Sequence, residues 1–109
     1  MFKIQNGKIY HTRGDTADFD LNIIMEAGYE ESYEAVLSVK RNIKDSDYAF
    51  QVKADSEGHI SIPHSKTQYL PFGEYVYDIE IKFDDGSTEG KYITIGPYPY
   101  FLTPDVTVL

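Results

Sequence analysis

Short runs of alternating apolar and polar residues dominate the sequence, and turn-forming residues separate them at fairly regular spacing. The cleanest run, residues 17–23, places Phe19, Leu21 and Ile23 on one face and acidic or amide side chains on the other. A period of two is typical of strands with one buried face, because successive side chains point to opposite sides of a sheet. The pattern therefore predicts an all-β chain in which helical segments are rare.

Two turn motifs mark places where the predicted strands reverse. Asn6-Gly7 separates residues 2–5 from residues 8–12, and this pair is preferred in the type I′ turn of a tight hairpin. Asp84-Asp85-Gly86-Ser87 predicts a second hairpin that leads into a strand over residues 88–95. Neighbouring strands are therefore expected to pair in antiparallel fashion.

The other predicted strands each carry an apolar face that we expect to point into a core. In chain order these faces comprise Ala35, Leu37 and Val39; Tyr48, Phe50 and Val52; Ile60 and Ile62; and Tyr75, Tyr77, Ile79, Ile81 and Phe83. Residues 25–32 are polar and contain glycine, which indicates a loop. Residues 65–70 suffice for one helical turn, which we expect to cross between sheets.

About eight strands in one small domain, with a crossover near residues 65–73, favour two packed sheets. The predicted fold class is therefore all-β, an immunoglobulin-like antiparallel β-sandwich of about 7–9 strands. A small Greek-key barrel is the alternative. Residues 1–96 are assigned to the sandwich, and residues 97–109 to a Pro/Tyr-rich C-terminal arm or an edge strand of the same domain.

The C-terminal segment departs from regular alternation. Pro97, Pro99 and Pro104 lack the N–H group that a central strand donates, which predicts an edge segment or an extended arm. Such a segment cannot bury all of its large side chains, so some of them are expected to form an assembly surface: Tyr98, Tyr100, Phe101 and Leu102. The alternative is a last edge strand that folds back and buries Phe101.

Charge and composition exclude several classes of partner. The formal net charge is −8, from 18 acidic and 10 basic residues, so the chain is poorly supplied with groups that neutralise phosphates and no nucleic-acid partner is expected. No apolar run approaches the ~20 residues of a membrane-spanning helix, so membrane insertion is not expected. Ten tyrosines and six phenylalanines suit both strands and protein interfaces.

The first residues and the cysteine content bear on the compartment. Met1 and the residues after it lack the apolar segment and cleavage site of a signal peptide, so we expect the protein to stay in the cytosol. The sequence contains no cysteine, which excludes disulfides, thiolate catalysis and cysteine-ligated zinc. The fold must therefore depend on packing.

Candidate chemistry is sparse, and each motif has a simpler structural interpretation. His11, His59 and His64 do not match a metal-ligand spacing. Asp45-Ser46-Asp47 and residues 84–87 contain acidic residues near a turn but lack the later glutamate of a full calcium loop.

Two further motifs are interpreted in the same way. Arg13-Gly14-Asp15 spells an integrin-binding tripeptide, yet Gly-Asp before a strand is more simply a turn. The acidic pairs Asp18/Asp20 and Asp78/Glu80 project from one solvent face of a strand and do not oppose each other across a cleft. We therefore expect no catalytic residue, no metal and no cofactor.

A set of motifs along most of the chain resembles a known family. The motifs are Arg13-Gly14-Asp15-Thr16, Phe19-Asp20-Leu21, Leu37-Ser38-Val39-Lys40-Arg41, Ile60-Ser61-Ile62-Pro63, Gly73-Glu74-Tyr75-Val76-Tyr77-Asp78-Ile79, Asp85-Gly86 and Thr103-Pro104-Asp105-Val106-Thr107. Together they resemble the N-terminal domain of the baseplate upper proteins of phages that infect Gram-positive bacteria. The resemblance implies an immunoglobulin-like sandwich that attaches receptor-binding or fibre components to the tail tip.

The expected function follows from this resemblance and from the tyrosine content. We expect a non-enzymatic structural component of a phage or prophage tail or baseplate, located in the virion after assembly. Its expected partners are other tail proteins or further copies of itself. The alternative is a carbohydrate-binding or adhesive module in which exposed tyrosine rings stack on sugars, and a hydrolase is a third hypothesis.

Overall fold

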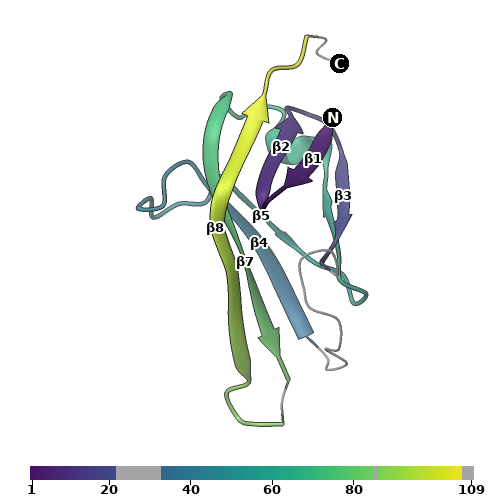
Figure 1. Cartoon of the computed structure of the whole chain (residues 1–109), viewed down its shortest axis with the longest axis vertical. Coiled ribbons are helices and arrows are strands. Elements are labelled where there is room, and N and C mark those ends of the chain that lie inside the picture. Colours follow the sequence, from purple (N-terminus) through teal and green to yellow (C-terminus); the bar gives the residue numbers. More distant parts are fainter. Residues whose placement is uncertain (22–32, 85, 107–109) are drawn as a thin grey trace.

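The computed structural model describes residues 1–21, 33–84 and 86–106 (Figure 1). This part of the chain contains eight strands and one short helix: β1 (Phe2–Gln5), β2 (Lys8–Thr12), β3 (Ala17–Asp20), β4 (Tyr33–Lys40), β5 (Phe50–Lys53), β6 (His59–Ile62), α1 (His64–Thr67), β7 (Gly73–Phe83) and β8 (Lys91–Thr103). The all-β prediction and the expected number of strands are confirmed. The expected helical turn is α1.

The strands form two sheets. Six strands make the larger sheet in the order β1-β2-β8-β7-β4-β5, and β3 pairs with β6 in a separate two-stranded sheet. Figure 1 shows the small sheet lying beside the large one, while the long β7–β8 hairpin extends beyond it toward the bottom of the view. The described residues thus form a two-sheet sandwich rather than a closed barrel. The immunoglobulin-like assignment stays a prediction.

The first hairpin has the geometry that its sequence predicts. Asn6 and Gly7 both adopt positive φ angles, 53° and 81°. Two central residues with positive φ define a type I′ turn, whose twist matches that of the flanking strands. The turn sets the antiparallel register of β1 and β2, in which Gln5 lies opposite Lys8.

The core contains the faces that alternation predicts. Buried side chains from both sheets form one cluster that includes Phe19, Leu21, Ala35, Leu37, Val39, Phe50, Ile60, Ile62, Tyr75, Tyr77, Ile79, Ile81 and Phe83. Tyr48 departs from the prediction, because β5 begins only at Phe50 and Tyr48 lies exposed in the preceding loop. Ile23 and the predicted loop over residues 25–32 lie outside the described residues.

Strand β8 corrects the account of the C-terminal segment. It lies inside the large sheet between β2 and β7, so the prediction of an edge strand or a free arm is wrong. β8 pairs with β2 in parallel, from Ile9 opposite Tyr100 to Thr12 opposite Thr103. The sheet is therefore mixed and not purely antiparallel as predicted. The expected boundary between residues 96 and 97 falls within this strand.

A register shift explains how prolines fit in an interior strand. The pairing of β7 with β8 shifts between Tyr77 and Ile79, at Gly96 and Pro97, whose peptide bond is cis. Before the shift Ile95 lies opposite Ile79, and after it Tyr98 lies opposite Tyr77. Pro97 and Pro99 both precede the residues that pair with β2, so on that side the missing N–H groups interrupt no ladder.

No helix among the described residues is long and apolar enough to cross a membrane.

Candidate functional site

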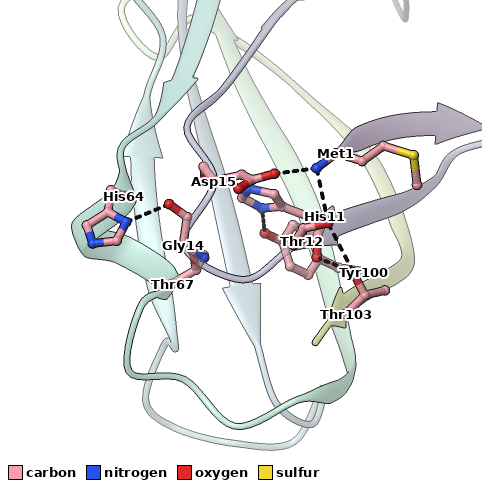
Figure 2. A network of polar contacts seen from close by, with 9 residues as sticks. All are labelled: Met1, His11, Thr12, Gly14, Asp15, His64, Thr67, Tyr100 and Thr103. Atoms are coloured by element: carbon pink, nitrogen blue, oxygen red, sulfur yellow. Dashed lines mark hydrogen bonds and ion pairs between the residues drawn. The ribbon is translucent and has the colours of Figure 1, made fainter. Parts of the chain in front are cut away.

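The end of the sandwich where β2 and β8 finish carries a polar cluster, the apical network, drawn in Figure 2. Its members are Met1, His11, Thr12, Gly14, Asp15, His64, Thr67, Tyr100 and Thr103. At its centre the imidazole of His11, which is fully buried, contacts the Asp15 carbonyl oxygen through Nε2 at 2.8 Å and the Tyr100 hydroxyl through Nδ1. A carbonyl only accepts, so Nε2 carries the proton and Nδ1 accepts a hydrogen bond from Tyr100.

Burial favours the neutral form of both of these groups. Desolvation lowers the pKa of His11, although its hydrogen bond to the Asp15 carbonyl and the Asp15 carboxylate act in the opposite direction. Desolvation also raises the pKa of the Tyr100 hydroxyl. A neutral histidine that accepts from a protonated tyrosine therefore links β2 to β8 inside the sandwich.

Two side chains of α1 hold the loop that follows β2. The Gly14 N–H group donates to the Thr67 hydroxyl at 2.8 Å, and the His64 Nδ1 lies 2.6 Å from the Gly14 carbonyl oxygen. One residue of the loop is thus bound through both of its backbone groups. Figure 2 shows that His11 and His64 approach this loop from opposite sides.

The amino group of Met1 completes the network. It donates to the Thr12 hydroxyl at 3.0 Å and forms an ion pair with the Asp15 carboxylate. On the β8 side, the Thr103 hydroxyl donates to the His11 carbonyl oxygen at 3.2 Å. These contacts fix the loop that carries the Arg-Gly-Asp tripeptide.

Arg13 extends the fixed region to two further segments. Its Nε donates to the Asp105 carboxylate at 2.9 Å, in an ion pair whose side chains are both mostly buried. Its guanidinium lies 4.0 Å from the centre of the Phe72 ring, a cation–π contact. Arg13 and Asp15 are therefore already engaged within the chain, which favours the structural interpretation of the tripeptide.

Large apolar side chains are exposed on the two segments that Arg13 joins. Tyr69 is 88% exposed and Phe72 is 41% exposed in the connection between α1 and β7, and Val106 is fully exposed next to Asp105. We call Tyr69, Phe72 and Val106 the apical surface. The contacts of Arg13 hold both segments against the body of the sandwich.

The four residues of the predicted assembly surface do not lie together. Tyr100 and Leu102 are buried in the core, so these two members of the candidate surface are not available to a partner. Tyr98 is 39% exposed, and its ring lies against Gly7 of the first turn. Phe101 is half-buried on the opposite face of the sheet, where its ring stacks on Tyr10 with 5.1 Å between ring centres. Alternation along an interior strand divides these residues between two faces.

A hollow that we call the outer groove lies on the face of the large sheet that points away from the core. It has a volume of about 510 Å³, and its floor includes Val36 and Ser38 of β4, Gln51 of β5, and Val76, Asp78 and Glu80 of β7. The Gln51 amide donates to the Ser38 hydroxyl at 3.0 Å. Desolvation raises the pKa of the Asp78 carboxyl, and the nearby Glu80 adds to this effect, whereas Lys40 opposes it.

Two exposed tyrosines border the outer groove. Tyr48 is 50% exposed and lies in the loop before β5, with the Lys40 ammonium 5.0 Å from its ring centre. Tyr92 of β8 is 56% exposed, with the Lys82 ammonium 5.7 Å from its ring centre. Lys40 also donates to the Asp45 carbonyl at 2.7 Å, which ties the loop of Tyr48 to the sheet.

His59 has its own acidic surroundings, away from the other two histidines. Its Nε2 lies 2.6 Å from Asp20 and its Nδ1 lies 3.4 Å from Asp55. Hydrogen bonds from the N–H groups of His59 and Glu57 lower the pKa of Asp55. No group of three metal-ligating side chains was found within residues 1–21, 33–84 and 86–106.

The two acidic segments that were interpreted as turns rather than calcium loops contain ordinary turn contacts. The Asp45 carboxylate accepts from the Asn42 N–H group at 3.0 Å, and the Asp84 carboxylate accepts from the Gly86 N–H group at 3.2 Å. Aspartate commonly stabilises turns in this way, because its side chain accepts hydrogen bonds from nearby backbone N–H groups.

The apical network and the outer groove were not predicted from the sequence. His11 and His64 meet at one loop although 52 residues separate them along the chain, and no spacing rule links them. Tyr48 and Tyr92 border one groove because β4, β7 and β8 are neighbours in the sheet. The only signal in the sequence was the high number of tyrosines.

Comparisons with protein-family models, with curated proteins and with solved structures found no match.

Proposed function

We propose that this domain is a non-enzymatic structural component of a phage or prophage virion, in the tail or baseplate, and that it binds another tail protein through the apical surface. The observation that carries the proposal is the exposure of Tyr69 and Phe72 on a segment that is held in place. An aromatic side chain held in water contributes binding free energy when a partner buries it, and little conformational entropy is lost if its segment is already fixed.

The apical network supplies that fixed base. Thr67 at the end of α1 binds Gly14, and Arg13 binds the segments of Phe72 and Asp105. The exposed aromatics thus sit on a frame that includes β2, α1 and β8. Interfaces of specific complexes are enriched in tyrosine and phenylalanine at their centres, and such a frame suits that role.

Three of the motifs that resemble baseplate upper proteins converge at this same end. Residues 13–16 follow β2, and residues 73–79 begin β7. Residues 103–105 start at the last residue of β8 and continue beyond it. The ion pair between Arg13 and Asp105 joins the first of these motifs to the last. A role in tail assembly accounts for their convergence, because the resemblance implies attachment to a neighbouring virion protein.

Co-expression tests the proposal. The chain is produced with each protein encoded by the adjacent genes in turn, and complexes are detected by co-purification and by light scattering. We expect a stable complex with one of these proteins or a defined oligomer of the chain itself. A strict monomer at high concentration, together with no complex with any neighbouring product, would contradict the proposal.

Variants locate the interface. Tyr69→Ser combined with Phe72→Ser should weaken the complex about tenfold or more, since truncating an interface aromatic commonly costs over 1 kcal/mol. Tyr92→Ser is the matched control, because it removes an equally large exposed ring from the outer groove instead. Equal weakening by the control would place the interface elsewhere.

A further inference from the structure

We propose that the outer groove binds a neutral oligosaccharide chain, with Tyr48 and Tyr92 as stacking platforms at its two ends. This inference is independent of the proposed role of the apical surface, which lies at the end of the sandwich. It depends on the shape of the groove, on its two aromatic borders and on the polar groups of its floor.

The groove is long enough for several sugar units. Tyr48 lies at one end of the groove, beside Lys40, which is opposite Val76 in the sheet. Tyr92 lies at the other end, opposite Lys82. Val76 and Lys82 are both on β7, so the two ends are roughly 20 Å apart at the rise of an extended strand. The volume of about 510 Å³ lies within the range typical of small-ligand sites.

The two tyrosines offer partly open ring surfaces. About half of each side chain is exposed, and a lysine ammonium lies over one face of each ring. The faces of aromatic rings carry partial negative charge and attract the slightly positive C–H groups on the apolar face of a sugar ring. A ring at each end of the groove therefore suits a chain of sugars better than a single compact molecule.

The floor between the tyrosines offers hydrogen-bonding groups of both kinds. Asp78 and Glu80 accept, Lys82 donates, and Ser38 and Gln51 do both. Sugar hydroxyls also donate and accept, so they can pair with such a mixture. Asp78 is partly buried, which raises its pKa, and its carboxyl group lines the groove where a ligand hydroxyl could hydrogen bond to it.

The distribution of charge favours a neutral ligand. Lys40 lies near one end of the groove and Lys82 near the other, Asp78 and Glu80 lie between them, and Glu34 is opposite Lys82, so the groove contains charges of both signs. A polyanion or a strongly basic peptide would meet repulsion from part of this surface. The chain as a whole carries a net charge of −8, which adds to the repulsion of polyanions.

The position of the groove on a sheet face also disfavours an extended peptide. β4 lies between β5 and β7, and β7 lies between β4 and β8, so both sides of each strand are already paired. A peptide strand binds most readily to an unpaired sheet edge, where backbone groups are free. The groove therefore offers side chains rather than backbone, which suits hydroxyl-rich ligands.

The direct test is titration of the intact chain with neutral hexasaccharides followed by NMR and calorimetry. The probes are cellohexaose, maltohexaose, chitohexaose and mannohexaose, with an oligogalacturonate and an extended neutral peptide as competitors. We expect saturable binding of at least one hexasaccharide, with chemical-shift changes at Tyr48, Ser38 and Tyr92. Binding of none of the four at millimolar concentration would overturn the proposal, as would preferential binding of the peptide or of the anionic sugar.

Substitutions connect the binding to the groove. Tyr48→Ala and Tyr92→Ala should each weaken binding about tenfold, the upper range for loss of one stacking contact. Tyr69→Ala removes an exposed ring outside the groove and should leave the affinity unchanged. Unchanged affinity in both groove variants, each with the wild-type circular dichroism spectrum, would contradict the assignment. Because Tyr69→Ala alters only the apical surface, failure of this proposal and failure of the assembly role give different results.

Discussion

His11 and Tyr100 form a buried hydrogen bond between an imidazole nitrogen of β2 and a phenol hydroxyl of β8, at the start of the parallel pairing between these strands. Their rings also meet edge to face, with 5.9 Å between centres. The bond requires a neutral imidazole to accept from the phenol, and the surroundings of His11 lower its pKa. The stability of the sheet is therefore coupled to pH.

We predict that the free energy of unfolding falls as the pH drops below 6.5, the ordinary pKa of histidine. The folded pKa of His11 is lower than this value, so the unfolded chain takes up more protons in acid and is favoured there. Nuclear magnetic resonance titration of the His11 ring should give a pKa below 6.5. A titration midpoint at or above that value would refute the prediction, and His64→Gln, which keeps His11, should leave the His11 midpoint unchanged.

Tyr77→Phe should destabilise the domain by about 1–2 kcal/mol, because it leaves the Gly7 carbonyl without the hydrogen bond that the Tyr77 hydroxyl donates. Burial raises the pKa of Tyr77 to about 12, so the wild-type protein should also lose stability above pH 10.0 as the unfolded phenol ionises first. Urea unfolding measured at neutral and alkaline pH checks both effects. Tyr92→Phe, which changes an exposed tyrosine, should alter neither, and an equal loss in that variant would argue against the role of the buried bond.

Gly7→Ala should destabilise the domain by about 1–2 kcal/mol, the usual cost of a left-handed conformation for a residue with a Cβ atom. Gly7 has a φ of 81°, and an added Cβ would lie 2.9 Å from the Tyr98 ring, which must then move. Asn6→Gly is the control, since glycine tolerates the φ of 53° at that position. Thermal unfolding followed by circular dichroism should rank Gly7→Ala well below both the wild type and the control.

The alternation of residues was sufficient to predict which faces enter the core. Leu37, Ile60 and Ile79 are all buried as their strands require, because one-sided burial imposes the period directly on the sequence. The type I′ turn at Asn6-Gly7 was equally accessible, since it depends on two adjacent residues. Local chemistry determines both features.

The order of strands was not accessible in the same way. Periodicity identifies a strand without identifying its neighbours, so nothing near Tyr100 indicated that it would pair with Ile9. The prolines suggested an edge, yet Pro97 lies at a register shift and Pro99 precedes the β2 ladder. The apical surface and the outer groove depend on such long-range neighbours, and for that reason their residues were not grouped in advance.

The parallel pairing of β2 with β8 has a consequence for how the chain acquires its structure. Within the large sheet, the first hairpin is attached only through the last strand, because the order is β1-β2-β8-β7. The β1–β2 hairpin can join the large sheet only after β8 has been synthesised. Contacts between segments so distant along the chain form slowly. Loss of residues 100–103 would therefore leave β2 without its strand partner on that side and separate the β1–β2 hairpin from the large sheet.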